Sequence, residues 1–173
     1  AVSGKKKFEV VHTPNSRSAI VDGFSTRNSY VFGTIENVKS KMSQAKYQKG
    51  SWTVSEIDLP QDGTLEIASA DSESGTFYSR YESFLTPPSL YYVSNVTKKV
   101  AQLKPVFNSN GLVMEQRITK SKDGTEIPYF VVRRENTEFN GKNPTLLYGY
   151  GGFNLPQKPG YLNATGKVWL ERG

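Results

Sequence analysis

The chain has 173 residues, with 22 Lys and Arg against 16 Asp and Glu, a net charge of +6, one histidine and no cysteine. The lack of cysteine excludes disulfides, thiolate metal sites and a cysteine nucleophile, and the single His12 excludes a multi-histidine metal site. The lysine-rich stretches Lys5–Lys7 and Lys39–Lys49 are interpreted as solvated surface, because no nucleic-acid-binding module accompanies them. No apolar run is long enough to cross a bilayer. We therefore expect a soluble protein, of the cytoplasm or the periplasm, that binds neither nucleic acid nor membrane.

Residues 8–107 are predicted to form short strands separated by turns. Apolar and β-branched runs alternate with clusters of Gly, Pro, Asn and Asp, and no helical period is sustained. This spacing is typical of an all-β sandwich, barrel or propeller, and the pattern alone does not choose among them. The candidate strands are Phe8–His12, Tyr30–Ile35, Trp52–Leu59, Leu65–Ala70, Thr76–Arg80, Leu90–Val93 and Val100–Leu103.

Two stretches of this part are ambiguous. Apolar residues stand at helical spacing within Glu36–Lys49, but the same residues also fit a polar, twisted strand. In Trp52–Leu59 the apolar positions change phase after Val54, and a β-bulge would restore the alternation.

The pattern changes after the turn-rich linker Asn108–Gly111. Two extended runs, Leu112–Ile118 and Glu126–Arg134, flank an Asp123-Gly124 pair, which is a strong hairpin signal. The apolar run in Thr145–Tyr150 does not alternate, and it predicts a third strand that is buried on both faces. The change favours an all-β part followed by the opening of an α/β part.

A glycine-rich turn follows the third predicted strand. Three glycines, Gly149, Gly151 and Gly152, release the backbone from the usual φ limits, while Tyr150 and Phe153 hold large side chains beside it. Backbone N–H groups and a phenol can therefore surround one small space. The turn lacks the last glycine of a dinucleotide fingerprint, and prolines follow where a helix would begin, so no cofactor is expected.

The last stretch of the chain is predicted to be extended and then helical. Pro156 and Pro159 do not fit a helix interior, and each restricts the residue before it. A helix is predicted to begin near Asn163 or Thr165 and to run through Leu170.

Two sequence motifs, one after the other along the chain, are characteristic of a known protein family. The segment Ser121-Lys-Asp-Gly-Thr-Glu-Ile-Pro-Tyr-Phe-Val-Val is followed by Leu-Leu-Tyr-Gly-Tyr-Gly-Gly-Phe-Asn. With them, and more weakly with Ser83-Phe84-Leu85-Thr86-Pro87, the chain resembles the prolyl oligopeptidase family of serine peptidases. The resemblance implies a mixed fold: residues 1–108 would form roughly the last two to three blades of a β-propeller. Residues 109–173 would then be the N-terminal part of an α/β-hydrolase domain, truncated before the nucleophile. The resemblance also favours a strand for Glu36–Lys49.

The same resemblance implies roles for two aromatic residues. The Tyr150 hydroxyl would help to hold the oxyanion of a tetrahedral intermediate, and Phe153 would line the pocket for a proline ring. For both, the alternative is a core aromatic residue. The triad is expected outside this chain, because no Gly-x-Ser-x-Gly turn is present and a hydrolase histidine follows its nucleophile, whereas His12 precedes the whole hydrolase part. We expect His12 to pack or to cap within the β part.

The implied function is that of a serine-type endopeptidase that hydrolyses short peptides on the carboxyl side of proline by acyl transfer, without metal or cofactor. The fragment itself is expected to be inactive and, with unpaired strand edges, to self-associate. An alternative is a non-catalytic β-rich module that binds a peptide or protein. A third possibility is an esterase or acyl-transferring relative on the same fold.

Overall fold

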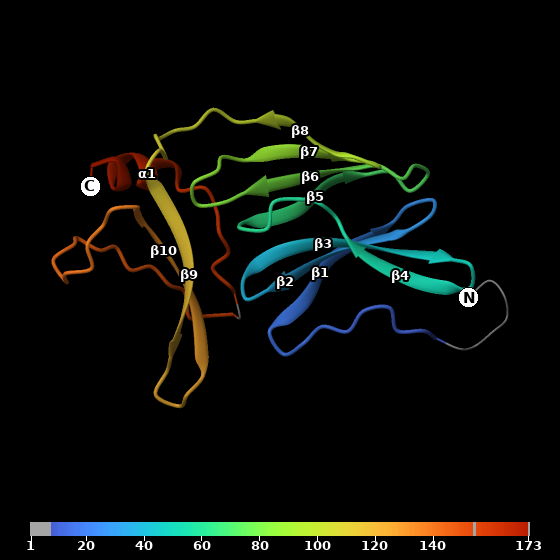
Figure 1. The fold of residues 1–173 in the computed structure, drawn as a ribbon, viewed down its shortest axis with the longest axis horizontal. Helices are drawn as coiled ribbons and strands as arrows, with labels where there is room; N and C mark the ends of the chain where they lie inside the picture. Colours follow the sequence, from blue (N-terminus) through green and yellow to red (C-terminus); the bar gives the residue numbers. More distant parts are fainter. Residues whose placement is uncertain (1–7, 154, 173) are drawn as a thin grey trace.

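Two four-stranded antiparallel sheets make up most of the fold. The computed structural model describes residues 8–153 and 155–172, and Figure 1 shows the two sheets side by side, with a two-stranded hairpin next to them. Each strand pairs with its neighbour along the chain, in the orders β1-β2-β3-β4 and β5-β6-β7-β8. Up-and-down sheets of four strands are the blades of a β-propeller. The strands are β1 (Ser18–Ser25), β2 (Tyr30–Glu36), β3 (Lys39–Gln48), β4 (Ser51–Glu56), β5 (Thr64–Ala70), β6 (Phe77–Glu82), β7 (Ser89–Val93) and β8 (Thr97–Gln102).

Most of the predicted strands are confirmed within one to three residues at either end. The ambiguous stretch Glu36–Lys49 contains β3, so its helical spacing does not produce a helix. Ser40 and Met42 alternate toward the core on this strand, and Ala45 follows them into it. Pairing with β2 and β4 on both sides satisfies the backbone, and this tertiary gain outweighs the local helical pattern.

Two expectations for this part are wrong, and one strand was not predicted. Phe8–His12 forms no strand, whereas β1, which no prediction included, forms the edge of the first sheet. No β-bulge interrupts the pairing of β3 with β4. The apolar phase changes after Val54 because β4 ends at Glu56, and the residues that follow it belong to the connection between the sheets.

The core lies between the two sheets. Each sheet turns one face toward the other, and β5 lies against β1 and β3. Ile57 and Leu59, from the connection between the sheets, fill the same space. Burial of each such side chain is worth about 1.5–3 kcal/mol, which makes this interface the main stabilising contact of the chain. The buried cluster consists of Val31, Met42, Ile57, Leu59, Leu65, Phe77, Tyr81 and Val93.

A buried phenol ties the connection between the sheets to β6. Tyr81 is 3% exposed, and its hydroxyl donates a hydrogen bond to Asp62 Oδ1. Burial and then the hydrogen bond to the nearby carboxylate raise the pKa of Tyr81 far above its ordinary value. The phenol therefore stays protonated over a wide pH range in the folded state.

The remainder of the chain forms a hairpin and a short helix. The hairpin pairs β9 (Leu112–Lys120) with β10 (Glu126–Arg134), as predicted, around a turn at Asp123 and Gly124. Hydrogen bonds from the Ser121 hydroxyl and the Thr125 backbone lower the pKa of Asp123 to about 2. The helix α1 (Asn163–Val168) confirms the predicted start, and the short helix η1 (Leu170–Arg172) follows it.

The hairpin and the C-terminal segment lie against the sheets rather than apart from them. In Figure 1 the C-terminal segment, drawn in red, passes between the hairpin and the two sheets. An ion pair of 2.5 Å joins Arg17, just before β1, to Glu126 at the start of β10. None of the helices described is both long and apolar enough to cross a membrane.

Truncation of the largest fully buried side chain provides a test of the interface between the sheets. Met42 is 2% exposed, so Met42→Ala should lower the free energy of unfolding by about 2–5 kcal/mol, through lost burial and a new cavity. Urea denaturation followed by circular dichroism measures the loss. The chain's other methionine offers a matched control: Met114→Ala, at a partly exposed site on β9, should cost less than half as much. Equal losses at the two sites would show that the sheets do not enclose the main core.

The pH dependence of stability tests the buried phenol. Because the folded-state pKa of Tyr81 is raised, its contribution is fully present below its ordinary pKa of about 10 and is lost as the pH rises above that value. Tyr81→Phe should therefore be less stable than the wild type by about 1–2 kcal/mol near pH 8. This difference should shrink between about pH 10 and pH 12. The measurement is urea unfolding across that range, with Tyr78→Phe, on the outward face of the same strand, as control. A difference that stays constant with pH would contradict the assignment.

Candidate functional site

The predicted third strand, Thr145–Tyr150, does not form a strand. All residues from 141 to 151 are exposed, with Leu147 at 93% and Tyr148 at 75%. An apolar run that does not alternate needs a partner strand on each side and cover on both faces. Among the described residues β9 and β10 pair only with each other, so this run has neither. The expectation that it is buried is therefore wrong for this structure.

Tyr150 lies at the end of this exposed run. Its side chain is 50% exposed, and its ring lies close to Gly152, where an added Cβ would be 3.4 Å from the ring. The ring is thus not sealed within packed side chains. Its hydroxyl makes no hydrogen bond to another described residue, which leaves it available to a partner that approaches from solvent.

The glycines of the turn do not use the backbone freedom expected of them. None of Gly149, Gly151 and Gly152 has a positive φ, whereas Phe153 has a φ of 55°. Gly149 and Gly151 have open space where a Cβ would lie, and only Gly152 has a close neighbour, the Tyr150 ring. Phe153 is 90% exposed. In this structure the left-handed turn is therefore made at Phe153, and Gly152 provides room for the phenol.

A charged cluster on the hairpin holds the loop that leads to this region. Glu115 pairs with Arg117 at 2.6 Å and also with Arg133, and hydrogen bonds from Arg117 and then Arg133 lower its pKa. The Phe139 ring lies 4.9 Å from the Arg117 guanidinium carbon and 5.2 Å from that of Arg133. Cation–π contacts of this kind fasten the loop to the hairpin just before Thr145.

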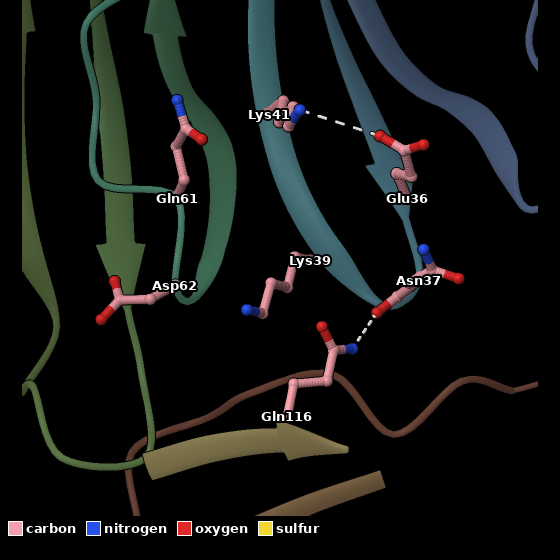
Figure 2. Close-up of a pocket in the computed structure, with 7 residues that line it drawn as sticks. All are labelled: Glu36, Asn37, Lys39, Lys41, Gln61, Asp62 and Gln116. Carbon is pink, nitrogen blue, oxygen red and sulfur yellow. Dashed lines mark hydrogen bonds and ion pairs between the residues drawn. The ribbon is translucent and has the colours of Figure 1, made fainter. Parts of the chain in front are cut away.

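A polar hollow lies where the hairpin meets the sheets, as Figure 2 shows. It has a volume of about 300 Å³. Gln116 on β9 donates a hydrogen bond to the backbone oxygen of Asn37, and Lys41 pairs with Glu36 at 3.7 Å. The Lys39 amino group points into the space between Asp62 and Gln116. The lining residues are Glu36, Asn37, Lys39, Lys41, Gln61, Asp62 and Gln116.

Sequence reasoning did not identify this hollow. Its residues come from the β2–β3 hairpin, from the connection between the sheets and from β9, so no local motif contains them. The one available signal is Asn37-Val38 between two strands, because Asn favours the left-handed backbone of a tight hairpin turn. Both residues have positive φ, 46° and 64°. The lining carries two cations and two carboxylates, so its net charge is zero and favours neither an anionic nor a cationic ligand.

The remaining candidates bring no further chemistry to the site. The His12 ring lies 5.2 Å from the Phe32 ring, which agrees with the packing role expected for it. Within residues 8–153 and 155–172, no group of three His, Cys, Asp or Glu residues is placed to hold a metal ion. The lysines Lys5–Lys7 lie outside the described residues.

Comparisons with known proteins extend over the whole chain. Residues 3–106 match the family model of the prolyl oligopeptidase N-terminal β-propeller domain. An uncharacterized peptidase of Sinorhizobium fredii is 36% identical over 167 residues, which cover 95% of this chain and 23% of the relative. The prolyl endopeptidase of Elizabethkingia miricola is 34% identical over 148 residues, which cover 83% of this chain and 21% of the relative.

A solved structure gives the same result. A post-proline cleaving enzyme from Rickettsia typhi has a TM-score of 0.81 and 27% sequence identity, over 100% of this chain and 26% of that one. The chain thus spans about a quarter of the length of the relatives it matches. Its two four-stranded sheets have the form of propeller blades, and they account for most of the residues that match the propeller family model. The chain therefore belongs to the prolyl oligopeptidase family, and its two sheets are part of that family's β-propeller.

Proposed function

We propose that the chain is part of a serine peptidase that cleaves short peptides on the carboxyl side of proline. The observation that carries the proposal is the likeness to the Rickettsia typhi post-proline cleaving enzyme, because it covers the whole chain, the Tyr150 loop included. The two Elizabethkingia relatives, both named prolyl endopeptidase, support it at 33–34% identity. The reaction would be acyl transfer through a serine ester, with serine, acid and histidine supplied from outside residues 1–173.

The proposal divides the chain into two parts. Residues 1–108 would be propeller blades, and residues 109–173 would open an α/β-hydrolase domain. The family-model match, which ends at residue 106, supports a boundary near this point. The exposed apolar run supports it as well, because Leu146, Leu147 and Tyr148 have the composition of a central strand that needs partners on both sides.

Tyr150 would act as a donor in the oxyanion hole. During acyl transfer the carbonyl oxygen of the substrate becomes an oxyanion, and a donor aimed at it stabilises the transition state more than the ground state. The half-exposed phenol supports this role, since its hydroxyl is not engaged by any described residue. A backbone N–H of the nucleophile turn would be the second donor.

Phe153 would form an apolar wall for the proline ring of the substrate. A proline side chain offers no hydrogen-bonding group, so its recognition rests on shape and apolar contact. At 90% exposure, the Phe153 ring can be covered by a ligand without displacing other described side chains.

Replacement of the phenol tests its catalytic role. In the full-length protein, Tyr150→Phe should lower kcat for a proline-containing chromogenic peptide by about 10²–10³-fold, because one oxyanion donor is worth roughly 3 kcal/mol. KM should change little, since the interaction is made mainly in the transition state. Tyr148→Phe, two residues away and also exposed, is the matched control and should retain activity. An unchanged kcat in Tyr150→Phe would show that the phenol is not an oxyanion donor and that Tyr150 is a structural aromatic residue.

The chain of 173 residues provides a second test. It contains no Gly-x-Ser-x-Gly turn, so it should show no turnover of a glycyl-proline chromogenic substrate. The full-length protein should cleave the same substrate and should lose this activity with a serine-reactive reagent. Turnover by the 173-residue chain that the reagent abolishes would overturn the proposed division of catalytic groups.

A further inference from the structure

The polar hollow of Figure 2 contains two groups of opposite charge that no ion pair neutralises. Of its four charged lining residues, Lys41 and Glu36 pair with each other at 3.7 Å. Lys39 and Asp62 remain, and within the part of the chain that the structure describes neither lies within 4.0 Å of an opposite charge. The Lys39 amino group points into the space between Asp62 and Gln116. The hollow therefore presents one unpaired cation and one unpaired anion.

The backbone holds both charged residues at the hollow. Lys39 is the first residue of β3, directly after the turn that joins it to β2. The N–H of the next residue, Ser40, donates a hydrogen bond of 3.2 Å to the carbonyl oxygen of Gly63, which follows Asp62 in the connection between the sheets. Ser40 is 3% exposed, so this hydrogen bond is buried. The packing of the two sheets thus determines the distance between the backbone segments that carry the two charges.

The Asp62 carboxylate is oriented from inside the core. Its Oδ1 accepts a hydrogen bond from the buried hydroxyl of Tyr81. No residue among those described donates to the other carboxylate oxygen, which leaves that oxygen for a ligand. A hydrogen bond between a carboxylate and an ammonium group is shorter and stronger than one between neutral groups. Asp62 can therefore act as a fixed acceptor for a cationic group in the hollow.

Two neutral amides complete the lining. The Gln116 amide nitrogen donates a hydrogen bond to the backbone oxygen of Asn37, and Figure 2 shows its side-chain oxygen on the side of Lys39. The Gln61 amide nitrogen likewise donates to Glu56. An amide oxygen has two lone pairs, so both glutamines keep an acceptor for an ammonium or a peptide N–H.

The size and the charge of the hollow restrict the ligand that it can take. Its volume of about 300 Å³ lies at the lower end of the range for small-molecule sites. A simple anion would pair with Lys39 but would face the charge of Asp62, and a simple cation would face that of Lys39. A molecule that carries both a carboxylate and an ammonium group meets each charge with its opposite.

We infer that the hollow is a binding site for a small zwitterion, a free amino acid or a dipeptide, whose carboxylate pairs with Lys39 and whose ammonium pairs with Asp62. The inference goes beyond the proposed function, because it assigns a ligand to residues that have no part in that function. It rests on the lining alone and does not require a peptidase. The products of peptide hydrolysis nevertheless belong to this chemical class.

Isothermal titration calorimetry of the full-length protein tests the inference. The probes are glycine and glycyl-glycine, which differ in the distance between their two charges. Neither contains proline, so the result does not depend on the proposed function. N-acetylglycine, which lacks the ammonium, and glycinamide, which lacks the carboxylate, are the matched control ligands.

Three single variants assign the binding to the hollow. Lys39→Gln and Asp62→Asn each remove one unpaired charge, and the new Asn keeps an oxygen that can accept the hydrogen bond from Tyr81. Lys41→Gln is the matched control, because Lys41 lines the same hollow but is already paired with Glu36. Circular dichroism checks that each variant folds. If Asp62→Asn does not fold, the comparison of Lys39→Gln with Lys41→Gln decides the result.

We expect at least one of the two zwitterions to bind with a Kd of about 1–10 mM, and both control ligands to bind at least about tenfold more weakly. Lys39→Gln and Asp62→Asn should each weaken binding by at least about tenfold, whereas Lys41→Gln should change it by less than about threefold. No saturable binding up to about 50 mM would overturn the inference. Equal binding of the control ligands, or equal losses in Lys39→Gln and Lys41→Gln, would overturn it as well.

Discussion

The burial of two sheet faces against each other is the constraint on which the rest of this structure depends. A single four-stranded sheet with one apolar face cannot hide that face by itself, so the second sheet must supply the cover. Met42 and Val31 on one side meet Phe77 and Leu65 on the other, and the connection between the sheets adds Ile57 to the same cluster. Once this interface is formed, the ends of the strands have definite positions in space.

Those fixed strand ends explain why the C-terminal part lies where it does. The end of the second sheet offers Thr64 and Glu82 as paired anchors for Pro159 and Tyr161. The hairpin is held to the first sheet in a similar way, by Gln116 and by the ion pair of Glu126. Polar contacts at the strand ends thus hold the hairpin and the C-terminal segment against the two sheets.

Short apolar and β-branched runs separated by turn residues were the most reliable signal in the sequence. Strands β2, β5, β6, β7, β9 and β10 were predicted because apolar and β-branched runs are bounded by turn residues or because an Asp-Gly pair marks the turn between them. The missed strand β1 contains Gly23 and Asp22 and a bulge after Ile20, all of which weaken the period. Phe8–His12 has a strand-like composition but finds no pairing partner in the described structure.

The glycine-rich loop shows the limit of such patterns. Its residue types supported a turn next to a buried strand, and the turn is present, but the run before it is exposed and the positive φ lies at Phe153 rather than at a glycine. The contacts of Pro159 and Tyr161 with the second sheet and the polar hollow were not predicted either, because their residues are far apart in the sequence.

The sequence by itself determined the β-rich character of residues 18–102, the hairpin around Asp123, the short C-terminal helix and the family resemblance, because each depends on local periodicity, a turn pair or a contiguous motif. Only the tertiary structure decided that the sheets share one core, that Ile57 leaves the strand to enter it, and that the segment after Phe153 is bound to the end of a blade. These outcomes depend on contacts between residues up to 95 positions apart, and no local pattern encodes which distant group will satisfy a given backbone atom or cover a given apolar face.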